Sequence, residues 1–307
     1  MRSIRTILVA GLSWMAVAAI PASVKAASMT LYGITDGPTG GIYSIDQTSG
    51  TATLINNLSG SGANTNNNFA GIGFGYLNGT AYASDVMATF GSNPTQVTTF
   101  GSVSLTTGVY SPISTLNGAT VSSLAANPTA GLLYGINNGS NTLEQITTAG
   151  AISTIGTVGA LGQTFNGIAF DSLNSTLYGV GGDNNLYSIN TSTGVATQVG
   201  GTTGLAGTFD GMTFDPSTGK LYVDDNNALT GSLYTLNLTT GAASLVGAGD
   251  NGSAAENDGY GITGIVSTAV PEPGTVALSA FALPALGVWV FRQRKRSAPS
   301  VATVSAV

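Results

Sequence analysis

Most of the chain consists of short segments in which apolar and polar residues alternate, each bounded by glycine, asparagine, aspartate or serine. The clearest pair, Phe165–Asp171 and Phe209–Asp215, has almost the same sequence and lies 44 residues apart. Each copy is followed by three further short apolar segments, the first of which begins with Leu-Tyr. Alternation over so few residues, with turn residues between the segments, predicts β-strands joined by tight turns. Each repeat is therefore predicted to form a four-stranded antiparallel meander.

Looser copies of the repeat extend over nearly all of residues 29–267. The first strand of the repeat recurs at residues 69–74 and 121–128, and the second strand recurs at Leu31-Tyr32. No first strand precedes Leu31, but a matching segment lies at the far end, at residues 262–266. We therefore expect the last strand to complete the first sheet, which ties the ends of the domain together and removes free sheet edges.

A four-stranded repeat of this length is typical of a β-propeller blade. Five first strands are found, so the sequence predicts an all-β propeller of five four-stranded blades. Six blades would follow if residues 78–120 contained an extra hairpin. A helical domain is excluded between residues 27 and 270, because glycine, asparagine and threonine at this density would destabilise helices.

The N-terminus has the three parts of a secretory signal peptide. Arg2 and Arg5 form a positive segment, residues 7–20 are apolar, and Val24 and Ala26 place small residues before a cleavage site. We place the cut after Ala26. The alternative is an uncleaved N-terminal membrane anchor, which the short apolar segment and the good cleavage site disfavour.

A second apolar segment, near the C-terminus, follows the motif Pro271-Glu272-Pro273. Residues 275–291 contain no charged side chain and are just long enough to span a thin bilayer as a helix. A basic cluster follows and is predicted to stay in the cytoplasm by the positive-inside rule. The residues of this cluster are Arg292, Arg294, Lys295 and Arg296.

A short proline-bounded motif, one helix and an arginine-rich cluster, in this order near the end of the chain, resemble the PEP-CTERM sorting signal of Gram-negative bacteria. The resemblance implies that an exosortase-type membrane protease recognises the tail and cuts near the Pro-Glu-Pro motif. The protein would then reach the cell surface or the exopolysaccharide matrix, after being held transiently in the inner membrane by the C-terminal helix. The chain departs from the family in the eleven residues, 297–307, that follow the basic cluster. A plain membrane anchor is the alternative.

These signals divide the chain into five parts, of which the propeller domain is the part expected to be exported. The parts are the signal peptide (residues 1–26), the β-propeller domain (27–268), a linker with the Pro-Glu-Pro motif (269–273), the transmembrane sorting helix (274–291) and a basic cytoplasmic tail (292–307).

Without the two signals, the chain is strongly acidic. Residues 27–270 contain one basic residue, Lys220, against thirteen acidic ones. Such a surface repels phosphate backbones, which argues against nucleic-acid binding, and its self-repulsion favours solubility. The chain has neither cysteine nor histidine. This excludes disulfides, serine–histidine catalysis and the ordinary zinc sites.

The acidic residues are the remaining candidates for chemistry. Asp210 begins a predicted first strand, while Asp183, Asp224 and Asp225 lie in predicted loops between second and third strands. Propeller topology brings these positions to one face, and clustered carboxylate and amide oxygens suit Ca²⁺. Calcium is therefore the one cofactor considered, with these four aspartates as candidate ligands. The alternative is that they form turns by accepting hydrogen bonds from backbone amides. A turn role is also expected of Asp171 and Asp215.

The tyrosines divide into two groups. Eight of the eleven recur at fixed positions in second or third strands, which predicts packing between blades. Tyr76, Tyr110 and Tyr260 lie outside these positions and are freer to contact a ligand. Both tryptophans, Trp14 and Trp289, lie in the terminal signals, so the exported domain lacks the tryptophan platforms of many sugar-binding surfaces.

Together these features predict an exported protein that is not an enzyme but a structural or binding module of the cell surface or exopolysaccharide matrix. Its predicted partners are the sorting protease and an exopolysaccharide. One alternative is a Ca²⁺-dependent polysaccharide-binding adhesin. Another is a glycan-cleaving enzyme, in which Asp210 with Asp183 or Asp224 would catalyse hydrolysis.

Overall fold

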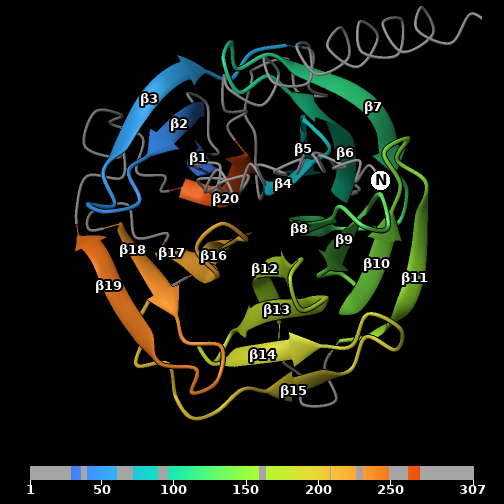
Figure 1. Cartoon of the computed structure of the whole chain (residues 1–307). Helices are drawn as coiled ribbons and strands as arrows, with labels where there is room; N and C mark the ends of the chain where they lie inside the picture. The colour runs from blue at the N-terminus through green and yellow to red at the C-terminus, as the bar shows by residue number, and fades with distance from the viewer. Residues whose placement is uncertain are drawn as a thin grey trace, which may run out of the picture.

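The computed structural model of the chain describes residues 29–35, 40–60, 72–88, 96–158, 164–207, 209–225, 231–248 and 262–269. Within these residues, twenty β-strands form five four-stranded antiparallel sheets. The sheets stand around a common axis with their first strands innermost and their fourth strands at the rim (Figure 1). The predicted five-bladed propeller is therefore confirmed.

The blades are numbered in the order of their second strands along the chain. Blade 1 consists of β20 (Ile262–Ala269), β1 (Met29–Thr35), β2 (Gly41–Ile45) and β3 (Ala52–Asn57). Blade 2 consists of β4 (Gly73–Leu77), β5 (Thr80–Ala88), β6 (Gln96–Val103) and β7 (Tyr110–Leu116). Blade 3 consists of β8 (Val121–Asn127), β9 (Leu132–Asn137), β10 (Thr142–Ile146) and β11 (Ile152–Thr157). Blade 4 consists of β12 (Phe165–Asp171), β13 (Thr176–Gly181), β14 (Leu186–Ile189) and β15 (Ala196–Gln198). Blade 5 consists of β16 (Phe209–Asp215), β17 (Lys220–Asp225), β18 (Ser232–Leu236) and β19 (Ala243–Ala248).

The predicted signal peptide, sorting helix and basic tail lie outside the described residues. Among the residues that are described, no helix has the length and apolar character needed to cross a membrane.

The two ends of the propeller meet in blade 1. Seven residues of β1 have partners in β20, beginning with Met29 opposite Ala269. The side chain of Thr268 also donates a hydrogen bond to the carbonyl oxygen of Thr30 (3.3 Å). The last strand therefore completes the first sheet, as the sequence predicted, and holds the ring closed.

Because successive strands alternate in direction, the ring has two different faces. The turn face carries the turns between first and second strands, at residues 78–79, 128–131, 172–175 and 216–219, together with the turns between third and fourth strands. The loop face carries the loops between second and third strands, such as residues 182–185, and the connections between blades. In blade 1 the two ends of the domain replace the first turn, so both ends lie at the turn face.

The first strand of blade 2 lies two residues later than the sequence predicted. Its pairing with β5 places Phe74, rather than Ile72, at the position that Ile168 occupies in blade 4. A shift by two residues keeps the same side chains on the same face of the strand, so alternation alone cannot detect it. The two-residue turn Asn78-Gly79, with both φ angles positive, sets the register instead. The described residues between 80 and 116 form β5, β6 and β7, so blade 2 leaves no extra hairpin for a sixth blade.

The hydrophobic core lies between neighbouring blades. Each of its clusters combines side chains from two adjacent blades. In one of them, the rings of Tyr134 from blade 3 and Phe170 from blade 4 have centroids 5.9 Å apart. Tyr82, Tyr178 and Tyr222 occupy the same second-strand position as Tyr134, and all four are at most 9% exposed. The predicted packing of these recurring tyrosines is therefore confirmed.

The turns between third and fourth strands follow one pattern. Asp46, Asn190 and Asn237 each begin such a turn, and their side-chain oxygens accept hydrogen bonds from the backbone amides two and three residues later (2.8–3.1 Å). Each turn ends at a glycine with φ between 68° and 79°, a conformation that is strained for residues with a side chain. These glycines are Gly50, Gly108, Gly150, Gly194 and Gly241.

The same turns join each blade to the blade before it. Gly201 N of the connection after blade 4 donates a hydrogen bond to the carbonyl oxygen of Thr240 in the turn of blade 5 (3.1 Å). At the ring closure, Gly247 of β19 lies so close to the turn of blade 1 that a Cβ atom would overlap the carbonyl oxygen of Ser49. Contacts of this kind therefore extend around the ring and include the junction between the last blade and the first.

Gly247→Ala is expected to destabilise the propeller by roughly 1–3 kcal/mol, because the added methyl group has to displace the backbone of the neighbouring blade. Gly201→Ala is the matched control, since a Cβ atom there meets nothing within 4 Å; it is expected to change stability by less than about 0.5 kcal/mol. Urea unfolding followed by circular dichroism measures both. Equal stability of the two variants would contradict this account of the ring closure.

Asp46 makes the stability of its turn depend on pH. Hydrogen bonds from the side chain of Thr48 and from the backbone of Ser49 and Thr48 lower the pKa of Asp46 from 3.8 to about 2. A lowered acid pKa stabilises the fold above the unfolded value, and this contribution is lost as the pH falls from 3.8 towards 2. Asn190 and Asn237 make the same turn without titrating. The stability of the wild type relative to Asp46→Asn is therefore expected to fall over this range of pH, as measured by urea unfolding; a constant difference would contradict it.

Candidate functional site

Five apolar side chains, one from the first strand of each blade, meet on the axis of the propeller. They occupy the same register position in each sheet, and none is more than 4% exposed. On the loop side of these side chains there is a void of only about 10 Å³. The five residues, called the axial ring below, are Phe74, Leu124, Ile168, Met212 and Ile265.

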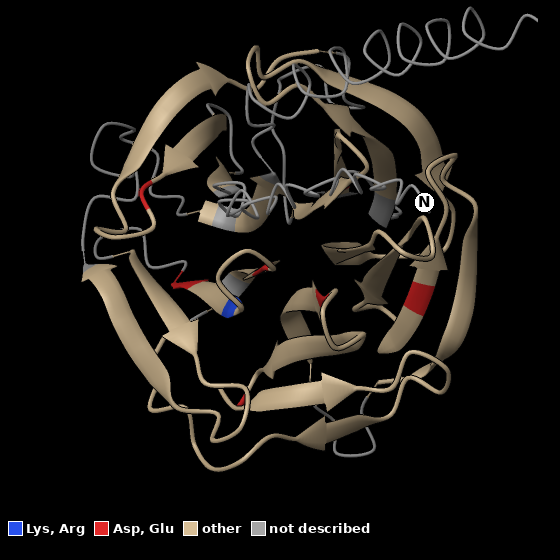
Figure 2. Ribbon diagram, in the orientation of Figure 1, with Lys and Arg blue, Asp and Glu red and all other residues tan. Residues whose placement is uncertain are grey.

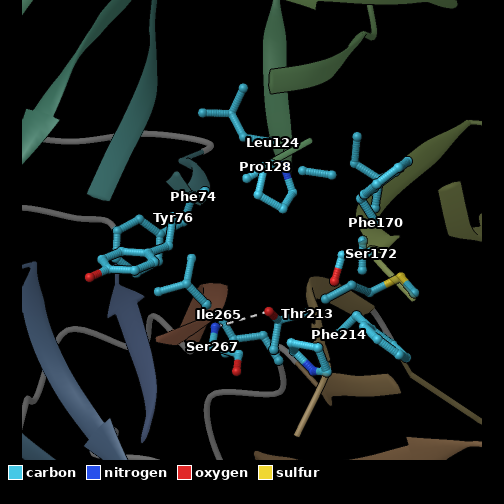
Figure 3. A pocket seen from close by; sticks show the side chains of 18 of the residues that line it. Phe74, Tyr76, Leu124, Pro128, Phe170, Ser172, Thr213, Phe214, Ile265 and Ser267 are labelled. Carbon is cyan, nitrogen blue, oxygen red and sulfur yellow. Dashed lines mark hydrogen bonds between the residues drawn. The ribbon is translucent and has the colours of Figure 1, made fainter. Parts of the chain in front are cut away.

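A cavity of about 270 Å³ lies between the axial ring and the turn face (Figure 3). Its lining includes the residues two positions beyond the axial ring, which are aromatic in three blades and small in two. These residues are Tyr76, Phe170, Phe214, Ala126 and Ser267. The first turns form its rim, through Asn78, Pro128, Ser172 and Pro216. None of the described residues that line the cavity is charged.

Three aliphatic hydroxyl groups lie among the apolar side chains of this lining, those of Ser172, Thr213 and Ser267, in addition to the phenol hydroxyl of Tyr76. Thr213 Oγ1 of blade 5 accepts a hydrogen bond from Ser267 N of blade 1 (3.0 Å), which joins the two blades at the ring closure (Figure 3). Ser267 Oγ is buried and has no hydrogen-bond partner among the described residues. An uncharged cavity with a few hydroxyl groups can enclose a small neutral molecule and orient it by hydrogen bonds.

The outcome differs among the three tyrosines that were predicted to be free to contact a ligand. Tyr76 lines the cavity, in agreement with the prediction. Tyr110 is only 2% exposed, and burial, followed by the charge of Asp85, raises its pKa; its predicted freedom to contact a ligand is therefore wrong. Tyr260 lies outside the described residues. The sequence signal that was missed is the small residue, Ala126 or Ser267, at a position where other blades have an aromatic ring.

Asp183 lies in the loop between β13 and β14, as predicted. Its carboxylate accepts hydrogen bonds from Asn185 N (3.1 Å), Asn185 Nδ2 (2.8 Å) and the Tyr187 hydroxyl (2.8 Å). Burial acts to raise the pKa of Asp183, but these hydrogen bonds outweigh it and hold the pKa below its ordinary value. Burial and the nearby carboxylate raise the pKa of Tyr187 to about 12. Asp183 thus has the hydrogen bonds of an aspartate that forms a turn.

Asp224 and Asp225 are not in a loop, in contrast to the prediction. β17 continues through both residues, because its pairing with β18 extends to Asp224. They are 1% and 6% exposed. A Cβ atom at Gly207 would lie 2.8 Å from Asp225 Oδ1, so this carboxylate lies against the connection between blades 4 and 5. Asn137 has the same place in blade 3, where its Oδ1 accepts a hydrogen bond from Thr120 N (3.0 Å).

Asp210 lies in β16 at a break in the register between Phe209 and Gly211, and its side chain lies outside the described part of the chain. Among the side chains that are described, no three acidic groups gather closely enough to hold a metal ion. The calcium site with Asp183, Asp210, Asp224 and Asp225 therefore stays a prediction. Asp171 and Asp215 accept hydrogen bonds within their own turns on the turn face, which confirms the turn role predicted for them.

Calcium titration by calorimetry, with and without exopolysaccharide, tests the calcium prediction. A site that includes Asp183 is expected to lose affinity about tenfold or more in Asp183→Asn, because one anionic ligand is removed. Asp46→Asn is the matched control, since Asp46 also forms a turn but lies on the opposite face. Absence of a binding heat in the wild type, or equal affinities in all three proteins, would contradict the prediction and leave Asp183 as a turn residue.

Two family models match parts of the chain. Residues 269–295 match the PEP-CTERM protein-sorting motif. This range contains Pro271-Glu272-Pro273 and the basic residues from Arg292 to Lys295. Residues 141–228, which begin just before β10 and end three residues after β17, match a domain of unknown function (DUF4394). No curated protein matches the chain.

Several solved structures are similar to the chain at low sequence identity. A structure of the nidogen/laminin complex has a TM-score of 0.48 and 13% identity, covering 80% of this chain and 100% of that chain. The major allergen Mala s 1 of Malassezia sympodialis has a TM-score of 0.47 and 15% identity, covering 70% and 74%. A protein of unknown function from Bacteroides thetaiotaomicron has a TM-score of 0.46 and 12% identity, covering 78% and 70%.

The sorting motif indicates where the protein is sent, and the fold describes the domain that is exported. PEP-CTERM motifs imply processing by an exosortase-type membrane protein and export to the cell surface or beyond it. The chain is therefore a five-bladed β-propeller that carries a PEP-CTERM sorting motif at its C-terminal end.

Proposed function

We propose that the protein is a non-catalytic structural or binding module of the cell surface or exopolysaccharide matrix, released from the membrane by the sorting protease. The propeller is the released part, and the axial cavity is its binding site. The observation that carries this proposal is the position of the ring closure relative to the two signals.

Both processing sites lie just outside the strands that close the ring. Ala26, the predicted end of the signal peptide, lies three residues before β1, and Pro271 lies two residues after β20. Cuts at these places leave all twenty described strands intact, including the β1–β20 pair. The released product would therefore be a closed ring that no longer depends on either signal for its fold.

The rim of the ring favours a separate, soluble module. The five outer strands β3, β7, β11, β15 and β19 contain no charged residue that would repel another chain, so their protection comes from their geometry. Four of them have a break in register with the third strand, and the fifth, β15, has only three residues. Such bulges and short edges disfavour pairing with a strand of another chain. The few charged residues of the described part are spread over different blades (Figure 2).

The described carboxylates support a role without catalysis. Asp46, Asp171, Asp183 and Asp215 accept hydrogen bonds from their own turns or loops. Glycan hydrolysis requires two carboxylates on either side of a bound substrate. The part of the cavity lining that the structure describes, in contrast, contains no carboxylate. Its chemistry suits the binding of a neutral molecule rather than acid–base catalysis.

Replacing Pro271, Glu272 and Pro273 by alanine is expected to block release. In an exosortase-containing bacterium, the wild-type propeller should be found in the medium or matrix, whereas the variant should stay in the membrane fraction. Pro299→Ala, a change behind the basic cluster, is the control and should behave like the wild type. Fractionation followed by immunoblotting measures the distribution.

Equal release of the wild type and the triple variant would contradict the sorting part of the proposal. Purified propeller incubated with exopolysaccharide tests the other part, with reducing ends as the measured product. Reducing ends that accumulate with time would contradict the non-catalytic role and favour the glycan-cleaving alternative.

A further inference from the structure

We propose that the axial cavity binds a small, uncharged and mainly apolar molecule that contains a ring and a hydrogen-bonding group. This inference rests on the proposed binding role and names the chemistry of its ligand. Four features of the cavity carry it: its size, the lack of charge in its described lining, its hydroxyl groups and the residues that keep it open.

The size of the cavity sets the size of the ligand. Its volume is about 270 Å³. An engineered cavity of roughly 150 Å³ lined by apolar side chains holds one benzene molecule. The axial cavity therefore has room for a six-membered ring with a short substituent, but not for a polymer chain.

The lining selects against charge. Three aromatic side chains, those of Tyr76, Phe170 and Phe214, stand around the cavity, and the axial ring forms its apolar floor (Figure 3). An ion that enters such a site loses its hydration, and no residue of opposite charge in the described lining compensates for the loss. A neutral ring loses little hydration and gains contacts with aromatic faces.

The hydroxyl groups orient the ligand. The side chains of Ser172 and Thr213 line the cavity and carry hydroxyl groups, whereas Ser267 Oγ is covered by protein and is not within reach of a bound molecule. Ser267 N is already bonded to Thr213 Oγ1, which holds this residue in place at the edge of the cavity. A ligand with a hydroxyl or carbonyl group can therefore form a hydrogen bond with Ser172 or Thr213.

Two small residues, rather than the fold itself, create the cavity. At the level of the axial ring, all five blades supply a large side chain, and the axis is filled. Two residues further along, Ala126 of blade 3 and Ser267 of blade 1 are small where the other three blades have an aromatic ring. Five blades can therefore fill the axis with side chains, as they do at the axial ring. The small side chains of Ala126 and Ser267 leave space on the axis near the turn face.

Photolabelling of the full-length chain in lipid nanodiscs tests the proposal. The probe is a neutral phenyl diazirine, and labelled peptides are identified by mass spectrometry. Labels are expected on the inner-strand peptides that contain Tyr76, Phe170 and Phe214. Excess benzyl alcohol should suppress these labels, whereas benzoate at the same concentration should not, because the two competitors share a ring and differ in charge.

A cavity-filling variant provides the second arm. Ala126→Phe places a ring where three other blades already have one, and it is expected to lower labelling of the inner-strand peptides roughly tenfold by occupying the site. Leu173→Phe is the matched control, since Leu173 belongs to a turn on the same face, is 61% exposed and does not line the cavity. It should be labelled like the wild type.

Equal suppression by benzyl alcohol and benzoate, or inner-strand labels that neither competitor removes, would overturn the proposal. Equal labelling of the wild type and Ala126→Phe would also overturn it. The competition experiment uses the wild-type protein, so it gives an answer even if Ala126→Phe fails to fold. Failure in both arms would remove the ligand site, while release of the propeller by the sorting protease would still be decided by fractionation.

Discussion

The pairing of β20 with β1 is the contact on which the rest of the structure depends. It joins the last strand of the propeller to the first over seven residue pairs and turns a row of four complete sheets into a closed ring. The turn of blade 1 and Gly247 of blade 5 meet at the same junction, so the outer part of the ring closes with the inner part. The cavity depends on this closure as well, because β20 supplies Ile265 to its floor and Ser267 to its lining.

Repetition of a few local contacts builds the ring around this junction. Each turn between third and fourth strands is held by a side chain at its first residue and by a glycine at its end, and it contacts the preceding blade. Asparagine replaces aspartate in this role in blades 4 and 5. Hydrogen bonds within turns or loops therefore explain Asp46, Asp171, Asp183 and Asp215, of which Asp183 alone was a calcium candidate.

The cavity exists because two blades do not follow the repeated pattern of large side chains along the first strands. The axial ring shows that five similar strands can fill the axis with five apolar side chains. Two residues further along the first strands, toward the turn face, two blades have a small residue and three have an aromatic one. The cavity therefore lies at the face where both ends of the domain lie. The C-terminal end of β20, after which the sequence continues to the sorting motif, is at this same face. β20 thus contributes both to the lining of the cavity and to the closure of the ring.

The sequence by itself determined the blade, the number of blades, the closing strand and the sorting motif. These features are encoded locally, through alternation with a period of two, turn residues at fixed offsets and a compact terminal signal. The prediction from the sequence placed β4 two residues too early, because the alternation of apolar and polar residues is unchanged by a shift of two residues. It also placed Asp224 and Asp225 in a loop and Tyr110 within reach of a ligand, because strand ends and burial depend on partners outside the local segment. Only the tertiary structure decided which side chains meet on the axis, since five strands that are far apart in the sequence converge there and each contributes one side chain to each level.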